Sequence, residues 1–336
     1  MKAGLFWALA AMLSLSGCGA DRSGQRPDSV TATTLAVQGS YRDALTPEAR
    51  QLLAADDAVR ILDPCGFIDY SVVERTATPT YIGTIDSGQL TMNTCNIFFG
   101  EASRSITVTI LDRYSGDTSM PGTPILIGDT TARMEPWKPY GGCDISIQLD
   151  TMNIRYHAVT SLWPEKNSCE SLSTIVEASA HLVHTRPLRE DSANPSMRTK
   201  LSRIDPCGVL DILRKTYPIG PGGITGIKPG CTFQYQPNDH PSKTVVISFG
   251  IAKRTQMDTF HPADPIDGVP IMTQSWNGGI GMMIELGSST PVPVMEPDGT
   301  TTPEFDTADV ECTGQGSAEL VHAITEAMIE LYHETP

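Results

Sequence analysis

Eight cysteines are the residues of this 336-residue chain with the clearest potential for chemistry. Thiols form disulfides, bind metals or act as nucleophiles, and their spacing helps to decide between these roles. No two of them form the C-x-x-C pair typical of structural zinc sites, so we predict no metal site among them. Two cysteines, Cys65 and Cys207, lie in closely similar heptapeptides, DPCGFID at 63–69 and DPCGVLD at 205–211. The heptapeptides indicate that the chain repeats itself.

The first cysteine, Cys18, belongs to a different pattern at the start of the chain. Lys2 precedes an apolar stretch from Leu5 to Leu15, which is too short to span a bilayer as a mature helix. The run Leu15–Cys18 (LSGC) resembles a bacterial lipobox. The resemblance implies a lipoprotein signal peptide at 1–17 and a diacylglyceryl (palmitate-type) anchor on Cys18. Residues 18–45 are rich in small and polar residues with balanced charge, which predicts a flexible tether.

Internal repetition defines the domains expected after the tether. We predict two copies of one domain at 46–185 and 201–336, joined by a linker at 186–200 that is locally basic. The basic linker is either simply exposed to solvent or holds the two acidic domains together electrostatically. Besides the heptapeptides, the landmarks taken as equivalent are Cys95–Phe98 with Cys231–Gln234, Gly122–Ile125 with Gly268–Ile271, Trp137 with Trp276, and Cys169 with Cys312.

The repeat also constrains how the cysteines pair in an oxidising compartment. Cys65–Cys95 and Cys207–Cys231 are equivalent pairs, and we predict both as disulfides. Cys143–Cys169 is the third predicted bridge, and each closes a loop that stabilises the fold by about 3 kcal/mol. Cys312 is then an unpaired thiol, either buried and inert or engaged in an intermolecular bond.

The elements expected around these residues give an α+β fold. Asp63 and Asp205 have the position of helix N-caps, each followed by a proline. Further helices are predicted at 47–61, 171–185 and 317–332, and strands at 106–111, 144–149, 245–251 and 280–286. We predict that each copy is a disulfide-stapled antiparallel sheet of four or five strands with helices packed on one face.

Candidate binding features are few. Trp137 and Trp276 each precede a strand in a Gly/Pro-rich segment, where they either cover the end of their own core or line a ligand or partner surface. Residues 288–311 form a long acidic, Pro/Thr-rich segment, which indicates disorder, a partner-docking loop or weakly held Ca²⁺. His181 and His184 are three residues apart on a predicted helix, but His181 falls opposite the apolar stripe of that helix, so we expect solvated histidines and no metal there.

Composition and missing motifs exclude several functions. The net charge of −15 disfavours nucleic-acid binding, which needs Lys and Arg for phosphates. The sequence contains no G-x-S-x-G elbow, P-loop lysine or H-E-x-x-H motif, so no enzymatic activity and no cofactor are predicted. A hydrolase site assembled from residues distant in the sequence is the less favoured alternative.

The D-P-C-G-[FV]-[IL]-D motif, followed by a second cysteine at a strand, resembles the domain of unknown function common in actinobacterial lipoproteins of the mycobacterial type. The disulfide-stapled α+β plan is also similar to extracytoplasmic sensor domains of mycobacterial kinases. These resemblances imply a lipid-anchored protein on the outer face of the cytoplasmic membrane. We expect a binding or accessory module for an envelope protein or a small apolar ligand, or a sensor-like partner of a membrane protein.

Overall fold

The computed structural model describes most of the chain from Ser40 onward, namely residues 40–84, 92–112, 121–137, 141–149, 152–160, 162, 166–217, 219, 230–235, 242–253, 257, 260–276, 278–288, 294–295, 301–314 and 317–336. The predicted signal peptide, the lipidation residue Cys18 and most of the tether lie outside these residues. No helix within the described ranges is long and apolar enough to cross a membrane.

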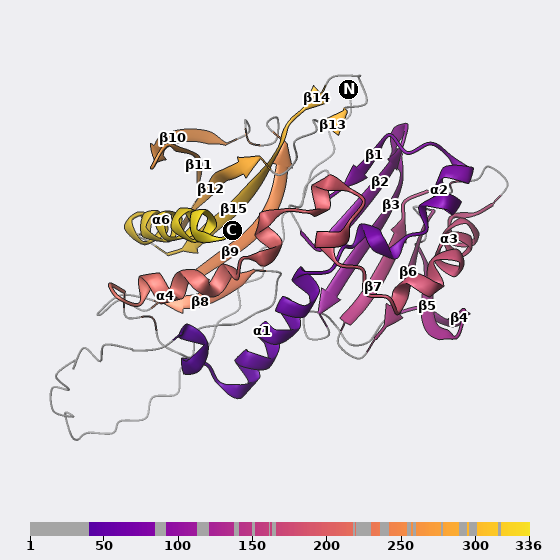
Figure 1. The fold of residues 1–336 in the computed structure, drawn as a ribbon, viewed down its shortest axis with the longest axis horizontal. Coiled ribbons are helices and arrows are strands. Elements are labelled where there is room, and N and C mark those ends of the chain that lie inside the picture. Colours follow the sequence, from indigo (N-terminus) through magenta and orange to yellow (C-terminus); the bar gives the residue numbers. More distant parts are fainter. Residues whose placement is uncertain are drawn as a thin grey trace, which may run out of the picture. The chain divides into compact units, whose positions relative to one another are not determined.

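Two antiparallel sheets form the framework (Figure 1). The first has seven strands in the order β1-β2-β3-β7-β6-β5-β4, and the second has six in the order β10-β11-β12-β15-β9-β8. The strands of the first sheet are β1 (Tyr81–Gly83), β2 (Thr94–Phe99), β3 (Glu101–Asp112), β4 (Thr123–Ile127), β5 (Thr130–Trp137), β6 (Gly142–Gln148) and β7 (Met152–Ala158). Those of the second are β8 (Cys231–Tyr235), β9 (Lys243–Lys253), β10 (His261–Ile266), β11 (Val269–Trp276), β12 (Gly279–Ser288) and β15 (Glu304–Thr313), with a separate small pair of β13 (Val294–Met295) and β14 (Thr301–Thr302).

The strand orders show that the two halves are copies of one plan. Read from the opposite edge, the second sheet runs β8-β9-β15-β12-β11-β10, which matches β2-β3-β7-β6-β5-β4 strand for strand. The α+β class and the tandem copies are therefore confirmed. The expected four or five strands per copy is too few, because edge strands such as β1 and β4 have only three and five residues and show no clear alternation of buried and exposed positions.

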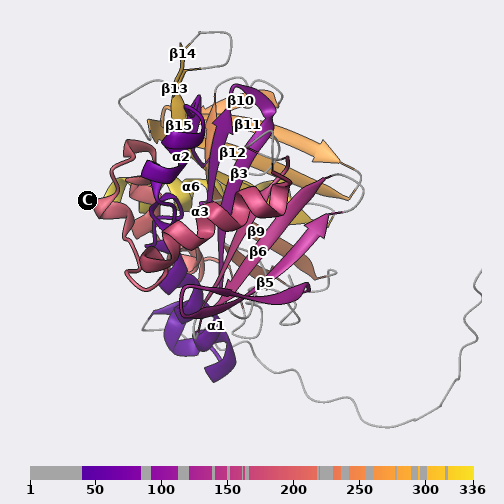
Figure 2. The ribbon, with the colours of Figure 1, turned by 90° about the vertical axis from the view of Figure 1, so that its right-hand side faces the viewer.

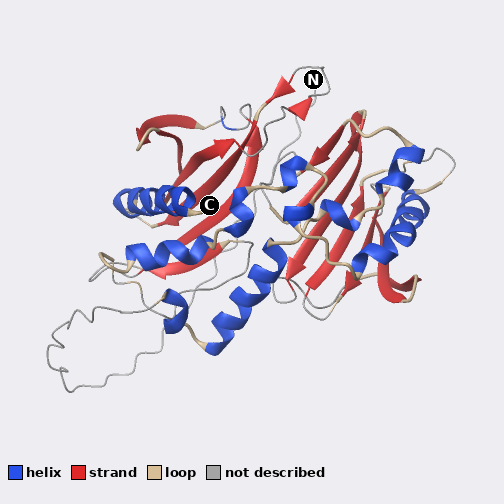
Figure 3. Ribbon diagram, viewed as in Figure 1, coloured by secondary structure: helices blue, strands red, loops and turns tan. Residues whose placement is uncertain are grey.

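One long helix packs on each sheet, α3 (Ser168–Val183) on the first and α6 (Ala318–Glu334) on the second (Figures 2 and 3). Asn167 and Glu170 form a capping box that starts α3, and Ser317 is the N-cap residue of α6. Their apolar stripes, which include Ile175 and Ile324, are buried in the two main cores. The remaining helices are α1 (Pro47–Arg60), α2 (Tyr70–Thr76) and α4 (Val209–Leu213), with single 3-10 turns at Tyr41–Ala44, Cys65–Phe67, Arg189–Asp191, Pro195–Met197, Lys200–Arg203 and Pro206–Gly208.

The structure contains the three predicted disulfides, Cys65–Cys95, Cys143–Cys169 and Cys207–Cys231, and leaves Cys312 as a buried free thiol. The assumed equivalence of Cys169 with Cys312 is wrong. Cys169 lies in the first turn of α3, whereas Cys312 lies on β15 opposite Ile280. In the first sheet the same register pairs Cys143 with Ala158, so Cys312 takes the position of Ala158.

Two predicted elements differ from the structure. Asp63 accepts a hydrogen bond from the Cys65 backbone N–H at 2.8 Å, but the chain makes only a 3-10 turn there, and α2 begins later with Asp69 as its cap. Gly66 lies so close to Pro187 that a Cβ on it would be 2.6 Å from the proline ring, so the turn leaves no room for a side chain at this position. The long acidic segment at 288–311 is not one loop. Its second half is β15, a central strand that places Glu304 and Asp306 on one face of the sheet and Asp309 and Glu311 on the other.

The predicted linker at 186–200 is also more structured than a solvated charge run. Leu188 makes an isolated bridge with Leu62, and Met197 is fully buried. Arg189 is only 1% exposed, and its guanidinium donates to the carbonyl oxygens of Arg60 and Met92. A run of basic residues predicts side chains in solvent. Arg189 is buried instead, because backbone carbonyl oxygens that the sequence does not reveal accept its hydrogen bonds.

Candidate functional site

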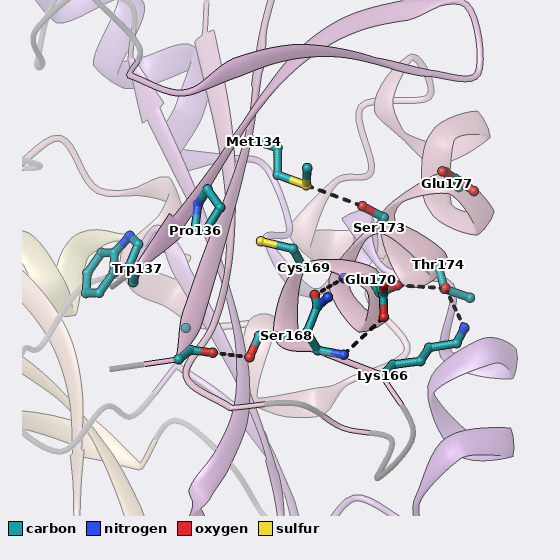
Figure 4. Close-up of a pocket in the computed structure, with 13 residues that line it drawn as sticks. Met134, Pro136, Trp137, Lys166, Ser168, Cys169, Glu170, Ser173, Thr174 and Glu177 are labelled. Carbon is teal, nitrogen blue, oxygen red and sulfur yellow. Dashed lines mark hydrogen bonds between the residues drawn. The ribbon is translucent and has the colours of Figure 1, made fainter. Parts of the chain in front are cut away.

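A cavity of about 860 Å³ lies in the first copy, between the end of β5 and the first half of α3 (Figure 4). Its size falls in the range of pockets that hold small molecules. It is lined by Met134, Pro136, Trp137, Gly141, Gly142, Lys166, Asn167, Ser168, Cys169, Glu170, Ser173, Thr174 and Glu177.

Two elements and one disulfide form the apolar wall of this cavity. Met134 and Pro136 alternate with outward-facing residues on β5, so both face α3. The Ser173 hydroxyl donates to the Met134 sulfur at 3.8 Å. Cys169 brings the disulfide to Cys143 into the wall and thereby ties the start of α3 to β6. The disulfide and the hydrogen-bonded strand β5 therefore hold the residues of this wall in place.

Polar side chains surround the mouth of the cavity, and most of them bond to one another. The Glu170 backbone N–H donates to the Asn167 side chain at 3.0 Å, and the Glu170 carboxylate accepts from the Asn167 backbone at 3.1 Å. The Lys166 ammonium donates to the Thr174 hydroxyl at 3.1 Å, and Ser168 donates to the Gly141 carbonyl. Because the capping box already occupies N–H groups of the first turn, this helix start is not a vacant anion site.

Trp137 links the cavity to a polar cluster on the opposite face of the sheet. Its indole N–H donates to the Asp144 carboxylate at 2.9 Å, and its ring centroid lies 4.6 Å from that of His157. Arg155 also donates to Asp144, with its Nε at 3.1 Å, and stacks over the indole at 5.9 Å. His157 Nδ1 lies 2.6 Å from the other carboxylate oxygen. These contacts fix the orientation of an indole that is 39% exposed.

The electrostatics of Asp144 follow from the same contacts. The residue is only 3% exposed, and burial by itself raises the pKa of a carboxyl group. Hydrogen bonds from His157 and Arg155 outweigh burial and hold the pKa of Asp144 below its usual range. Asp144 is therefore ionised at neutral pH and anchors three donors. His157 bonds to this carboxylate, and among the described residues no serine hydroxyl bonds to its ring.

The second copy carries different chemistry at the equivalent positions. The register places Trp276 beside Gly279, and Gly281 and Glu311 take the positions of Asp144 and His157. The Trp276 indole lies against two glycines of β12, since a Cβ built on Gly279 would be 2.5 Å from the indole and one on Gly281 3.2 Å. Asp309 takes the position of Arg155, and burial, with a smaller contribution from Glu311, raises its pKa to about 7.

The two tryptophans singled out in the sequence therefore differ in their surroundings. Both are about 40% exposed, but Trp137 borders the cavity and Trp276 does not line it. The sequence reasoning missed Met134, Pro136 and Asp144. The alternation of Cys143, Asp144 and Ile145 indicates a polar residue on the outer face, but only the strand register shows that Trp137, Arg155 and His157 meet it.

Comparison with known proteins gives no relative on which to base a function: no family model, curated protein or solved structure matches the chain. Within the part of the chain that the structure describes, no group of three or more His, Cys, Asp or Glu side chains is placed to hold a metal ion. The function has to be argued from the geometry of the site.

Proposed function

We propose that the chain is a lipid-anchored lipoprotein on the outer face of the cytoplasmic membrane that acts as a non-enzymatic binding module of the cell envelope. Its binding site is the cavity beside α3, and its ligand is a small apolar molecule. The observation that supports this proposal most strongly is the cavity itself. It has a volume of about 860 Å³ and an apolar wall made by Met134, Pro136 and the Cys143–Cys169 disulfide.

The polar groups around the cavity favour a largely uncharged ligand. Lys166 bonds to Thr174, and the carboxylates of Glu170 and Glu177 balance its charge. A strongly anionic ligand would meet these two carboxylates. The hydroxyls and the ammonium at the mouth suit one or two hydrogen bonds to a polar end, while the body of the ligand lies on the thioether and the proline ring.

The edge of β5 disfavours a peptide ligand. β4 pairs with β5 only as far as Met134, so residues 135–137 have no partner on that side within the described strands. Peptides that extend a sheet need backbone donors along the edge, and Pro136 has none. Proline at an open edge blocks strand addition, which supports a non-peptide occupant.

The anchor accounts for the location of such a module. The lipobox at Leu15–Cys18 supports acylation of Cys18, and the part of the predicted tether that precedes the turn at Tyr41–Ala44 separates the domains from the bilayer. The last residues of the predicted tether belong to the folded part, since Tyr41 and Leu45 are buried in the core of the second copy. Three disulfides fit an oxidising compartment.

The experiment uses the two equivalent tryptophans as a matched pair. An environment-sensitive apolar dye is titrated into the chain carrying Cys18→Ser, which removes the lipid. Trp137→Ala is expected to weaken saturable dye binding about fivefold, since an aromatic contact in the cavity lining contributes about 1 kcal/mol. Trp276→Ala has the same exposure and should leave binding unchanged. Equal losses in both variants, or dye binding that does not saturate, would contradict the proposal.

A further inference from the structure

A second cavity, separate from the one beside α3, has the charge of an anion site. Its volume is about 460 Å³. It is formed by the end of α1 and the segment that joins the two copies, and it is lined by Ile61, Leu188, Arg189, Glu190, Arg198, Thr199, Ser202 and Arg203. Three arginines and one glutamate leave this lining with a positive balance, in a chain whose net charge is −15.

The base of this cavity contains a buried positive charge. Arg189 is 1% exposed, and its guanidinium donates to the Arg60 and Met92 carbonyl oxygens and contacts the Met197 sulfur at 3.7 Å. Burial lowers the pKa of Arg189 to about 10, and nearby Asp63 opposes that shift. The group is thus protonated at neutral pH.

The two other arginines are exposed and sit at the cavity wall. No ion pair among the described residues involves Arg198 or Arg203, whereas other arginines, such as Arg42 and Arg60, are paired with carboxylates. The hydroxyl groups in the lining already donate hydrogen bonds within the protein. Thr199 donates to Asp306 at 2.7 Å, and Ser202 donates to the Thr199 carbonyl at 2.8 Å. Recognition of a ligand here therefore depends on guanidinium groups.

We propose that this cavity binds a phosphate-type oxyanion through Arg198 and Arg203, above the buried charge of Arg189. Guanidinium groups present paired N–H donors that match the oxygens of phosphate. The acidic surface elsewhere does not prevent this, because at physiological ionic strength charges separated by more than about 8 Å are largely screened. Ile61, which is 47% exposed at the rim, could cover an apolar substituent of a phosphate ester. The proposal is independent of the apolar ligand of the first cavity.

Titration calorimetry with inorganic phosphate tests the site in the Cys18→Ser chain. The wild-type cavity should give saturable binding that weakens as salt is added. Replacing both arginines, Arg198→Gln with Arg203→Gln, should weaken binding at least about tenfold, since hydrogen bonds to charged groups are the strong ones. The matched control is Arg50→Gln with Arg75→Gln, two exposed arginines outside the cavity lining, which should bind as the wild type does. Glu190→Gln should tighten binding about two- to fivefold, because it removes the one carboxylate in the wall.

Vesicles distinguish the two sources of such an anion. Vesicles of phosphatidylcholine alone are compared with vesicles that contain one part in five of phosphatidylglycerol. Arginine-dependent binding of free phosphate alone assigns the site to a soluble phosphate compound. Arginine-dependent sedimentation with the anionic vesicles assigns it to a lipid headgroup. If neither probe binds, or if the control pair loses as much binding as the cavity pair, the proposal is wrong.

Discussion

The Cys143–Cys169 disulfide should stabilise the first copy strongly, yet its loss should leave the fold intact. The bridge spans 26 positions, for which the chain-entropy relation gives about 3.5 kcal/mol. Removing the buried Cys143 sulfur adds about 1 kcal/mol of lost packing. The second copy shows that docking of the helix does not require the bridge, because Ile280 takes the position of Cys143 and α6 still packs on β12. We therefore expect Cys143→Ala with Cys169→Ala to lower the free energy of unfolding by about 4.5 kcal/mol.

Urea unfolding without reductant, followed by far-UV circular dichroism and tryptophan fluorescence, measures this loss. Cys312→Ala is the matched control, since it removes a buried sulfur that is not in a bridge and should cost about 1 kcal/mol. The first copy should unfold at lower urea in the double variant, with its native spectrum preserved. A loss no greater than that of the control would refute the assignment of the stability to the bridge. Loss of the native spectrum would refute the claim that sheet packing alone docks α3.

Two further predictions concern the carboxylates at equivalent positions of the sheets. Burial raises the pKa of Asp309 to about 7, so the folded state holds its proton more tightly than the unfolded chain, and stability falls as pH rises from about 4 to about 7. Asp309→Asn should remove that fall in stability. It should stabilise the protein on the order of 2 kcal/mol at pH 8 and have little effect at pH 4. Urea unfolding at both pH values measures the two effects, and equal effects would contradict the prediction. The pKa of Asp144 is lowered, so its contribution is present at neutral pH and is lost as pH falls below about 4. Asp144→Asn should destabilise the protein on the order of 2 kcal/mol at pH 7, after allowance for the half-exposed Arg155, and a penalty that does not shrink as pH falls below about 4 would refute the electrostatic explanation.

The repeat made much of the fold predictable. Matching heptapeptides around Cys65 and Cys207 fixed the copies and two of the bridges, and apolar periodicity located α3 and α6. Prediction from the sequence failed where the same residue type occurs both in exposed segments and in buried strands. Acidic residues of β15 look like a solvated segment, because a central strand with polar residues on both faces lacks the usual alternation. The sequence matches Cys312 with Cys169 because each precedes a predicted helix, whereas only the strand register places Cys312 on β15 opposite Ile280.

The candidate site was less predictable than the fold. Trp137 was singled out by its repeat and its position before a strand, but the cavity depends on contacts between β5 and α3 that sequence spacing does not encode. Arg189 illustrates the same limit, since an arginine in a basic, proline-containing linker is expected in solvent. Its burial becomes evident only when the carbonyl oxygens of Arg60 and Met92 are found beside it.

Native mass spectrometry of the Cys18→Ser chain, exported from an actinobacterial host, tests the central claim most directly. We expect an added mass of one small apolar molecule that survives purification of the wild-type domains. Ser173→Phe, which places a ring opposite Met134 inside the cavity, should abolish that mass without lowering thermal stability. The proposed apolar site would be contradicted if the wild-type protein carries no added mass and also fails to retain an added apolar ligand. It would also be contradicted if the added mass persists unchanged in Ser173→Phe.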